Sequence, residues 1–303
     1  MTTRPRWAAS VTRASSCQAF FRAGRERAVS WWQRIHGYVY ARWPYGYIGA
    51  AIGKKRVHKA LRLLFWPWLA KALWPKRWAA GYHGKVLPTP EAVKLVHIQE
   101  PVMAALPEQV IPFATARDLI LQEPDHLVVL DCPCRLSREN PCLPLDVCLI
   151  VGEPFASFVL SHHAEHARAI SPEEAEEILR AEAGRGHVHH AFFKEGMLGR
   201  FYAICNCCSC CCGAMQAQKH GTPMLISSGY VAAVEAALCQ GCGTCAKVCP
   251  FGAIAFDGRP TVDRAVCMGC GVCVNHCPAG ALSLQRDEAK PAPLEVEAFL
   301  RQR

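Results

Sequence analysis

From about Tyr82 onward, apolar and polar positions follow the short, interrupted periods of a globular chain. The segment TPEAVKLVHI predicts a short helix, with Thr89 as its N-cap and Pro90 as its first residue. A second short helix is predicted after Thr115, in ARDLILQ. The apolar run HLVVLD, residues 126–131, has the length of a buried strand and leads directly to a pair of cysteines. The pattern therefore predicts mixed helices and strands, with a site at one strand end.

The clearest helix of the sequence is SPEEAEEILRAEAGRG. Ser171 is its predicted N-cap, Pro172 opens it, Glu174 completes a capping box and Gly184 ends it. Its acidic residues are expected on the solvent face, which makes the helix part of the scaffold. Histidines flank it in SHHAEHARAI and GHVHHAFF, and we expect most of them to be solvated or hydrogen-bonded rather than metal ligands.

The first part of the chain has a different pattern, in which Arg and Lys interleave with Trp and Tyr in WWQRIHGYVYARWPYGYIG and VHKALRLLFWPWLAKALWPKRW. Through Lys85 there are 17 Lys or Arg and a single acid, Glu26, whereas the remainder has 17 Lys or Arg and 24 acids. The longest apolar run, Leu63 to Ala70, contains Pro67 and is far shorter than the roughly 20 residues that span a bilayer. We therefore expect no membrane crossing.

Such a basic, aromatic segment has three interpretations: a surface for nucleic acid, a segment at the headgroup boundary of a membrane, or a docking arm for an acidic protein partner. Indole rings and long cationic side chains both prefer the membrane interface. We expect peripheral contact with the inner face of the cytoplasmic membrane, with a protein partner second and nucleic acid the least favoured.

The composition is unusual in its 19 cysteines, which is far more than packing requires. Disulfide scaffolds belong mostly to short secreted chains, and the arginines near the start interrupt any apolar signal segment. We therefore expect a reducing, cytoplasmic compartment and metal chemistry. Cys17 stands apart from the other cysteines and is set aside.

Eight of the cysteines form an internal repeat with a period of 28 residues. Each run reads C-x₂-C-x₂-C-x₃-C-P, the pattern of bacterial proteins with two cubane clusters. Glycines between the cysteines allow close backbone approach and N–H bonds to sulfur. The first run is Cys239, Cys242, Cys245 and Cys249, and the second is Cys267, Cys270, Cys273 and Cys277.

From about Ala237 to Gln285 the chain resembles the bacterial two-[4Fe-4S] ferredoxins. The resemblance implies a βαββαβ fold, which strands at AIAF and ALSL and a hairpin turn at Asp257-Gly258 fit. It also implies that each cluster takes three cysteines of one run and the fourth of the other. The implied ligands are Cys239, Cys242, Cys245 and Cys277 for one cluster, and Cys267, Cys270, Cys273 and Cys249 for the other.

Ten cysteines are left, in DCPCR, PCLPLDVC and CNCCSCCCG. Ten buried thiols are too many for packing alone, and a zinc site uses only about four. Soft thiolates select iron–sulfur clusters, so we expect at least one additional cluster. Adjacent cysteines on an extended strand point to opposite faces, so we expect part of the group to face a second centre or simply to pack. The candidate ligands are Cys132, Cys134, Cys142, Cys148, Cys205, Cys207, Cys208, Cys210, Cys211 and Cys212.

The order of these motifs resembles a family of cysteine-rich 4Fe-4S dicluster-domain proteins of anaerobic and facultative bacteria, over about Tyr82 to Leu284. Arg135, directly after Cys134, is interpreted either as a positive charge beside a cluster or bound anion, or as the partner of an acid.

The expected fold class is α+β. Its parts are a basic, helical segment over 1–81, a mixed α/β cysteine-rich domain over 82–232, a two-cluster ferredoxin-like domain over 233–286 and a tail over 287–303.

The expected function is single-electron transfer between a redox partner protein and a further cysteine-bound cluster in the middle domain, through two [4Fe-4S] clusters. A second hypothesis is a reductase with an open-site cluster in the middle domain, which the surplus thiols, the histidines and Arg135 motivate. A third is a redox-sensing regulatory module. The sequence has no GxGxxG or P-loop, so nucleotide chemistry is not expected.

Overall fold

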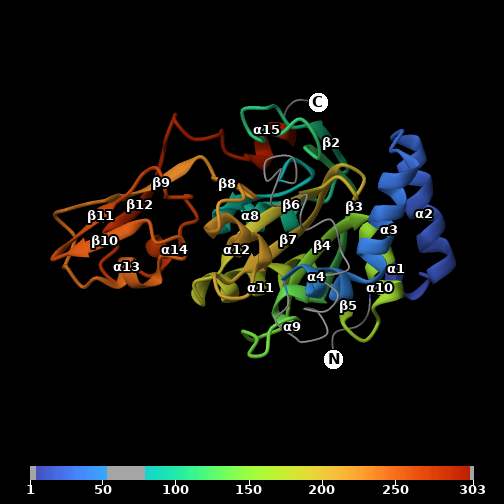
Figure 1. The fold of residues 1–303 in the computed structure, drawn as a ribbon, viewed down its shortest axis with the longest axis horizontal. Helices are drawn as coiled ribbons and strands as arrows, with labels where there is room; N and C mark the ends of the chain where they lie inside the picture. Colours follow the sequence, from blue (N-terminus) through green and yellow to red (C-terminus); the bar gives the residue numbers. More distant parts are fainter. Residues whose placement is uncertain (1–4, 53–78, 301–303) are drawn as a thin grey trace.

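The computed structural model describes residues 5–52 and 79–300. They form a large sheet covered by helices and a smaller unit that extends from one end of it (Figure 1). The mixture of helices with a mostly antiparallel sheet confirms the expected α+β class.

The large sheet has eight strands in the described part of the chain. Seven follow the order β2-β3-β4-β7-β6-β1-β8, and β5 pairs with β3. Most pairs are antiparallel; β1 with β8 and a short contact of β3 with β7 are parallel. The strands are β1 (Tyr82–Leu87), β2 (Val102–Ala105), β3 (Asp118–Asp131), β4 (Asp146–Glu153), β5 (Ala167–Ile170), β6 (Val188–Lys194), β7 (Arg200–Cys207) and β8 (Leu225–Ile226).

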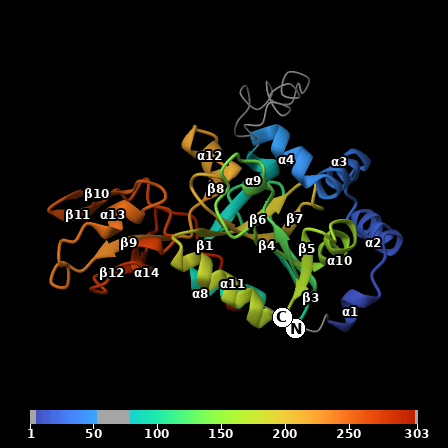
Figure 2. The same cartoon turned by 90° about the horizontal axis from the view of Figure 1, so that it is seen from below.

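Alternation along the strands divides the interior into two cores, one on each face of the sheet. In β3, Leu127 and Val129 pack into the core shared with α8 (Thr89–Val96) and α11 (Pro172–Gly184). Val128 and Leu130 point to the opposite core, which α10 (Phe155–His162) covers. Figure 2 shows α8 and α11 on one side of the sheet and α10 on the other.

The N-terminal helices complete the core on the α10 side. Phe20 is fully buried there, with its ring 5.4 Å from that of Phe158, and the hydroxyls of Tyr40 and Tyr202 lie 2.9 Å apart. Gly37 allows close packing, because a Cβ there would lie 1.6 Å from the carbonyl oxygen of Gly196. The helices are α1 (Arg6–Ala9), α2 (Arg13–Glu26), α3 (Trp31–Arg42) and α4 (Pro44–Ile52).

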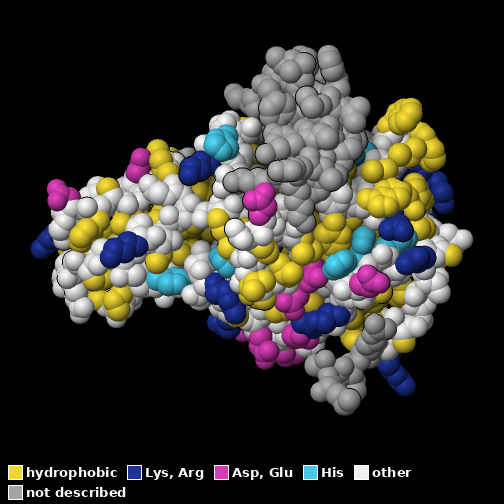
Figure 3. All heavy atoms as spheres, turned by 60° about the horizontal axis from the view of Figure 1, so that its bottom comes forward, with side chains coloured by type: hydrophobic (Ala, Val, Ile, Leu, Met, Phe, Trp, Pro, Cys, Tyr) yellow, Lys and Arg dark blue, Asp and Glu magenta, His cyan; other side chains and the backbone are white. Residues whose placement is uncertain are grey.

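Residues 5–52 are thus helical, as expected, and also part of the folded body. Hydrophobic and basic side chains lie side by side at the end of the molecule that α2 and α3 occupy (Figure 3). Among the described residues no helix has the length and apolar character needed to cross a bilayer. The apolar run Leu63 to Ala70 and most of the second Trp-rich stretch lie outside the described residues.

The predicted helix in ARDLILQ is wrong, because these residues belong to β3. Leu119 and Leu121 are fully buried in the core of α8, while Ile120 pairs with Met103 of β2. The strand pairing and the two-residue spacing of buried leucines outweigh a local helix preference. The predicted strand at 126–131 is the second half of the same element.

Two of the predicted helices are confirmed, with differences at their N-termini. α8 begins at Thr89, but Pro88 occupies the N-cap position and the Thr89 hydroxyl instead lies 3.2 Å from Nε2 of His189. α11 is capped by Ser171, whose hydroxyl accepts a hydrogen bond from the amide of Glu174. The Glu174 side chain does not return to the cap, because it pairs with Arg168.

The smaller unit has the βαββαβ order of the ferredoxin-like expectation. β9 pairs antiparallel with β12, and β10 and β11 form a hairpin whose turn residue, Gly258, has φ of 71°. The elements are β9 (Tyr230–Val234), α13 (Thr244–Val248), β10 (Ile254–Asp257), β11 (Arg259–Val262), α14 (Val272–Asn275) and β12 (Leu282–Arg286). After it, α15 (Val296–Leu300) returns toward β2 and α8.

Candidate metal centres

Two small cavities in the βαββαβ unit are each lined by four cysteines, and each has a volume of about 20 Å³. Each set combines three cysteines of one run with the fourth of the other, because the chain crosses between the halves after α13 and again after α14. This is the grouping that the ferredoxin resemblance implies. The first cavity is lined by Cys239, Cys242, Cys245 and Cys277, and the second by Cys249, Cys267, Cys270 and Cys273.

Backbone amides around these cysteines donate hydrogen bonds that stabilise negatively charged sulfur. Amides donate hydrogen bonds to sulfur from Ala232 to Cys267, from Ala253 to Cys249 and from Ala281 to Cys277, at 3.3 to 3.4 Å. Such bonds stabilise thiolates and tune the metal that they hold. The glycines of both loops have positive φ, namely Gly241, Gly243, Gly269 and Gly271.

At Gly269 the need for glycine is also steric, since a Cβ would lie 2.2 Å from the carbonyl oxygen of Tyr230. Burial raises the pKa of the Cys270 thiol and raises that of Cys273 to about 12, so both are protonated near neutral pH unless a cation replaces the proton. Four soft sulfurs around a small dry cavity, with amide donors behind them, fit a cubane iron–sulfur cluster.

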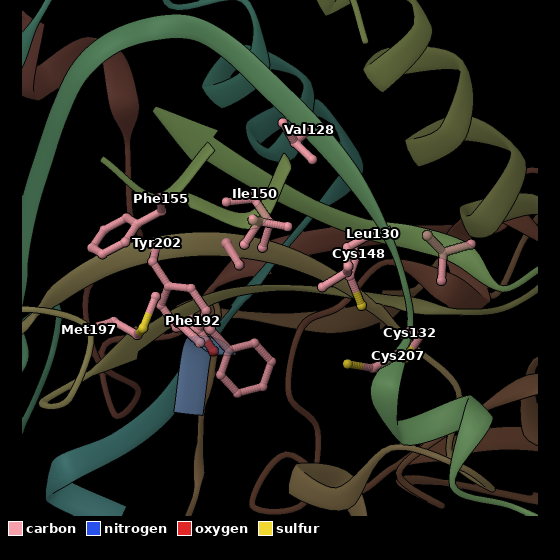
Figure 4. Close-up of a cluster of buried hydrophobic side chains, with 14 of the residues drawn as sticks. Val128, Leu130, Cys132, Cys148, Ile150, Phe155, Phe192, Met197, Tyr202 and Cys207 are labelled. Atoms are coloured by element: carbon pink, nitrogen blue, oxygen red, sulfur yellow. The ribbon is translucent and has the colours of Figure 1, made fainter. Parts of the chain in front are cut away.

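A larger cavity, of about 70 Å³, lies in the large sheet on the α10 side. We call it the thiol cavity. Figure 4 shows Cys132, Cys148 and Cys207 close together beside the apolar side chains of this core. The cysteines that line it are Cys132, Cys134, Cys148, Cys205, Cys207, Cys208 and Cys212.

Strand register explains why these cysteines converge. Cys148 of β4 is the direct partner of Cys205 in β7, and Cys207 lies two residues further along β7 on the same face. Asn206, between them, points the other way and donates a hydrogen bond to the carbonyl of Val147 at 2.8 Å.

The remaining lining cysteines come from strand and helix ends. Cys132 is the N-cap residue of the short helix α9 (Pro133–Leu136), which also carries Cys134. Cys212 is the N-cap residue of α12 (Gly213–Lys219). Backbone amides at the start of each helix therefore lie near the cavity.

The thiols of this cavity contact one another. A hydrogen bond with Cys134, together with burial, raises the pKa of Cys132 to about 12. Hydrogen bonds with Cys132 and Cys205, then burial, raise the pKa of Cys148. These groups are neutral unless a metal replaces their protons, so binding of a metal here is coupled to proton release.

Arg135 is fully buried and fixes the geometry between the cysteine segments. Its Nη2 donates to the carboxylate of Glu182 at 2.5 Å and to the carbonyl of Asn206 at 3.1 Å, and its Nη1 donates to the carbonyl of Pro144. The pairing with an acid is therefore observed, and Arg135 also lines the thiol cavity. Glu182 is itself 0% exposed, so the expectation that the acids of this helix all face solvent is wrong for this residue.

Four of the ten cysteines form a separate group, which we call the rim quartet: Cys142, Cys208, Cys210 and Cys211. Their sulfurs all lie within 4.8 Å of one another, and Cys208 is also the one that reaches the thiol cavity. Cys210 is exposed and Cys142 half-buried, whereas the other two are buried. The structure thus divides the ten cysteines into six that belong to the thiol cavity alone and four at its rim.

No described histidine lines the thiol cavity, and most of those around α11 are hydrogen-bonded elsewhere, although both ring nitrogens of the buried His190 have no hydrogen-bond partner. His163 Nε2 lies 2.7 Å from the carbonyl of Ala41, and His187 Nδ1 lies 2.6 Å from Glu182. Cys17 is also remote from both groups, with its sulfur 3.4 Å from Nε2 of His162.

Sequence analysis did not identify three tyrosines that line the thiol cavity, or the lysine beside them. Tyr40, Tyr82 and Tyr202 line the thiol cavity together with the cysteines. Lys194 lies behind them, with Nζ 4.2 Å from the ring centre of Tyr40 and 4.4 Å from that of Tyr82. Burial lowers the pKa of Lys194 to about 7. These three tyrosines come from segments that are distant in the sequence, so no local pattern marks them.

The βαββαβ unit contacts the large domain through its second cysteine cavity. Cys270 and Met268 pack against the same hydrophobic core as Cys134 and Cys205. His276 Nε2 lies 3.1 Å from the carbonyl oxygen at Gly184, the last residue of α11. The cavity of Cys239 is lined in part by Pro260 of the β10–β11 hairpin. In Figure 1 this hairpin is at the end of the unit that projects away from the large sheet.

Comparison with known proteins agrees with this geometry. Residues 238–281 match the family model of the 4Fe-4S dicluster domain. A search of curated proteins finds no significant match. The C-terminal part of the chain is therefore a 4Fe-4S dicluster domain, which implies two [4Fe-4S] clusters.

Proposed function

We propose that this chain is an iron–sulfur electron-transfer protein that relays single electrons between a redox partner protein and a further thiolate-bound cluster in the middle region. The observation that carries the proposal is the presence of three cysteine-lined cavities, namely the two small cavities of the βαββαβ unit and the thiol cavity. The small cavity of Cys270 and the thiol cavity border one hydrophobic core. A bound [4Fe-4S] cluster supplies a centre that accepts and releases one electron at a time.

The proposed ligands follow the cavity linings. Four cysteines around each small cavity satisfy one cubane, and no histidine or acidic side chain lines either cavity. We assign Cys239, Cys242, Cys245 and Cys277 to the outer cluster, and Cys249, Cys267, Cys270 and Cys273 to the inner one.

The chain's own residues join the inner cavity to the thiol cavity through packed protein. Val272, next to the inner cysteines, is buried in the core that surrounds the thiol cavity. The end of α11 lies between the two, with Gly184 bonded to His276 on one side and Glu182 bonded to Arg135 on the other. Val272 gives the connection a buried contact, whereas the hydrogen bond between Gly184 and His276 lies at the surface.

The thiol cavity supports a cluster rather than a single ion. Its volume is about 70 Å³, against about 20 Å³ for each cavity of the dicluster domain. Its cysteines surround this space and are too far apart to bind one ion together. Among the described cysteines, only those of the rim quartet have sulfurs that all lie within 4.8 Å of one another. Six thiols around such a space provide the ligands for at least one iron–sulfur cluster.

One observation favours a reductase as the second candidate function. The tyrosine-lined part of the thiol cavity leaves room beside the cysteines, and Lys194, with a pKa of about 7, can exchange a proton behind it. Reduction of a bound substrate needs protons as well as electrons. A substrate-dependent oxidation of the chemically reduced protein that Tyr202→Phe abolishes would favour this function over a relay.

The first test is the metal content of the full chain purified without oxygen. We expect roughly 12 to 16 irons with matching acid-labile sulfide, since each cubane holds four irons. In Cys148→Ser/Cys205→Ser, which alters two paired cavity positions, iron should fall to about eight, the content of the dicluster domain.

The matched control is Cys17→Ser, a cysteine of the same core outside the cavity, which should leave the iron content unchanged. Iron of about eight in the unaltered protein, with zinc in the thiol cavity, would contradict a relay through this cavity.

We also propose that the end of the molecule at α3 contacts an anionic bilayer surface. Trp31 and Trp32 are 57% and 77% exposed, and the guanidinium of Arg34 lies 5.8 Å from the ring centre of Trp31. Exposed indoles beside cations are typical of residues that lie at the headgroup boundary.

Replacing both tryptophans by serine should weaken binding to phosphatidylglycerol vesicles about a hundredfold or more, because burial of each large apolar side chain contributes about 1.5 to 3 kcal/mol. Vesicle co-sedimentation measures this. Met103→Ser, an equally exposed apolar side chain on β2, is the control. Equal binding by all three proteins would leave a protein partner as the occupant of this surface.

A further inference from the structure

The rim quartet differs in geometry from every other cysteine group of the protein. All four sulfurs lie within 4.8 Å of one another, and the Cys210 sulfur is 3.0 Å from that of Cys142 and 3.6 Å from that of Cys211. Neither quartet of the dicluster domain, all of whose residues are described, forms a group this compact. The rim quartet is therefore spaced for a smaller object than the clusters of that domain.

Coordination geometry identifies the object. Four thiolates on one tetrahedral ion, with metal–sulfur bonds of about 2.3 Å, place their sulfurs about 3.8 Å apart. A cubane binds each thiolate to a different iron at a corner of the cube, which pushes the four sulfurs further apart. The spacing of the rim quartet fits the single ion.

We propose that Cys142, Cys208, Cys210 and Cys211 bind one thiophilic, tetrahedral ion, Zn²⁺ or a single iron, in a site separate from the cluster of the thiol cavity. Four thiolates so close together repel one another, and a divalent cation removes that repulsion. The contact of 3.0 Å between Cys142 and Cys210 is too long for a disulfide bond, whose sulfurs are about 2.05 Å apart.

The surrounding chain holds the site in place before any ion binds. Arg138 donates two hydrogen bonds to the carbonyl of Cys211, at 3.1 and 2.8 Å, and a third to the carbonyl of Ile52 at 2.9 Å. The loop that carries Cys142 is thereby tied to the loop of Cys208 to Cys212 and to the end of α4. Positioned ligands reduce the entropy lost on binding.

The exposed Cys210 gives an ion access from solvent, while Cys208 connects the site to the thiol cavity. An ion at the rim would cross-link the segment that follows Cys134 to the segment that follows Cys207. We infer a structural role, in which the ion adds a cross-link between two cysteine segments that Arg138 already ties together.

The test is elemental analysis of the full chain purified without oxygen, with zinc and iron measured together. We expect Cys142→Ser/Cys210→Ser to lose one ion per chain, zinc or iron, and to keep the visible absorbance of the clusters. Cys148→Ser/Cys205→Ser is the reciprocal variant and should keep the rim ion while it loses cluster iron. Because the rim variant loses a single ion and the reciprocal variant loses the several irons of a cluster, failure of the rim site is distinguishable from failure of the electron-transfer proposal.

The identity of the ion is read from spectra. Co²⁺ added to protein stripped of zinc should give the intense ligand-field bands of a tetrahedral thiolate site, and these should be absent in Cys142→Ser/Cys210→Ser. A single rim iron would instead give a high-spin ferric signal after oxidation. Loss of about four irons in the rim variant, which would indicate cubane ligands, or a Cys142–Cys210 disulfide with no bound ion, would overturn the proposal.

Discussion

Replacing Cys249 by alanine should remove the same cluster as replacing Cys270, although the two cysteines belong to different runs. Both line the inner cavity, so each change is expected to cost about four irons per chain, and the double variant should lose no more than about four. Cys242 lines the outer cavity, so Cys249→Ala combined with Cys242→Ala should lose about eight. Iron and sulfide analysis with EPR of the reduced protein measures these losses.

The opposite result would identify a different grouping. If each run held its own cluster, Cys249→Ala with Cys242→Ala would lose only about four irons, and Cys249→Ala with Cys270→Ala would lose about eight. Ala255→Ser, on the exposed face of the hairpin strand β10, serves as a control that touches neither cavity.

Replacing Glu182 by glutamine should destabilise the large domain by about 3 to 5 kcal/mol, which is the cost of breaking a buried ion pair by removal of one partner. Both Arg135 and Glu182 have side chains that are 1% exposed, and an uncharged amide would leave the guanidinium buried without its counter-charge. Anaerobic denaturant titration followed by circular dichroism measures the loss. The cluster content of the thiol cavity should fall as well, because Arg135 directly follows Cys134.

Glu176→Gln is the matched control, since Glu176 is on the same helix and pairs with Arg180 and His97 at the surface. It should leave the stability nearly unchanged. A loss no larger in Glu182→Gln than in this control would show that Glu182 does not hold Arg135 in place.

The pH dependence of stability should change in the same variant. Burial alone would raise the pKa of Glu182, but hydrogen bonds from His187 and Arg135, and the charge of Arg135, hold it below its ordinary value. A lowered pKa in the folded state contributes stability that is complete above the ordinary pKa of glutamate and is lost as the pH falls through the lowered value. Glu182→Gln should lack this part of the acid-induced loss.

The dicluster domain could be predicted from sequence because its information is local. Two-residue spacers between cysteines, glycines at positive φ and a proline after each run are fixed by a few neighbouring residues. The strands at its hairpin and at Leu282 were predicted for the same reason. The α11 helix, with its cap at Ser171, is a further example.

The middle region could not be predicted to the same depth, because its site depends on pairings between distant segments. The register that brings Cys148 opposite Cys205 also decides that Cys210 falls outside the cavity. The same long-range pairing turns ARDLILQ into a strand and buries Glu182 against Arg135, which is 47 positions away in the chain. Spacing alone gave ten candidate ligands and no division among them.

The wall of the thiol cavity has a consequence for how the protein is assembled in the cell. Tyr40, Pro44 and Ile48, from α3 and α4, line the same space as Cys212, which the ribosome adds much later. The cavity is therefore not complete until Cys212 has been synthesised and has joined the earlier segments. A polynuclear cofactor is far larger than water, so a cluster bound here would have to enter before α3 and α4 dock, or through their transient release. Delivery of the metal is thus tied to the order of folding, and these helices determine when the site closes.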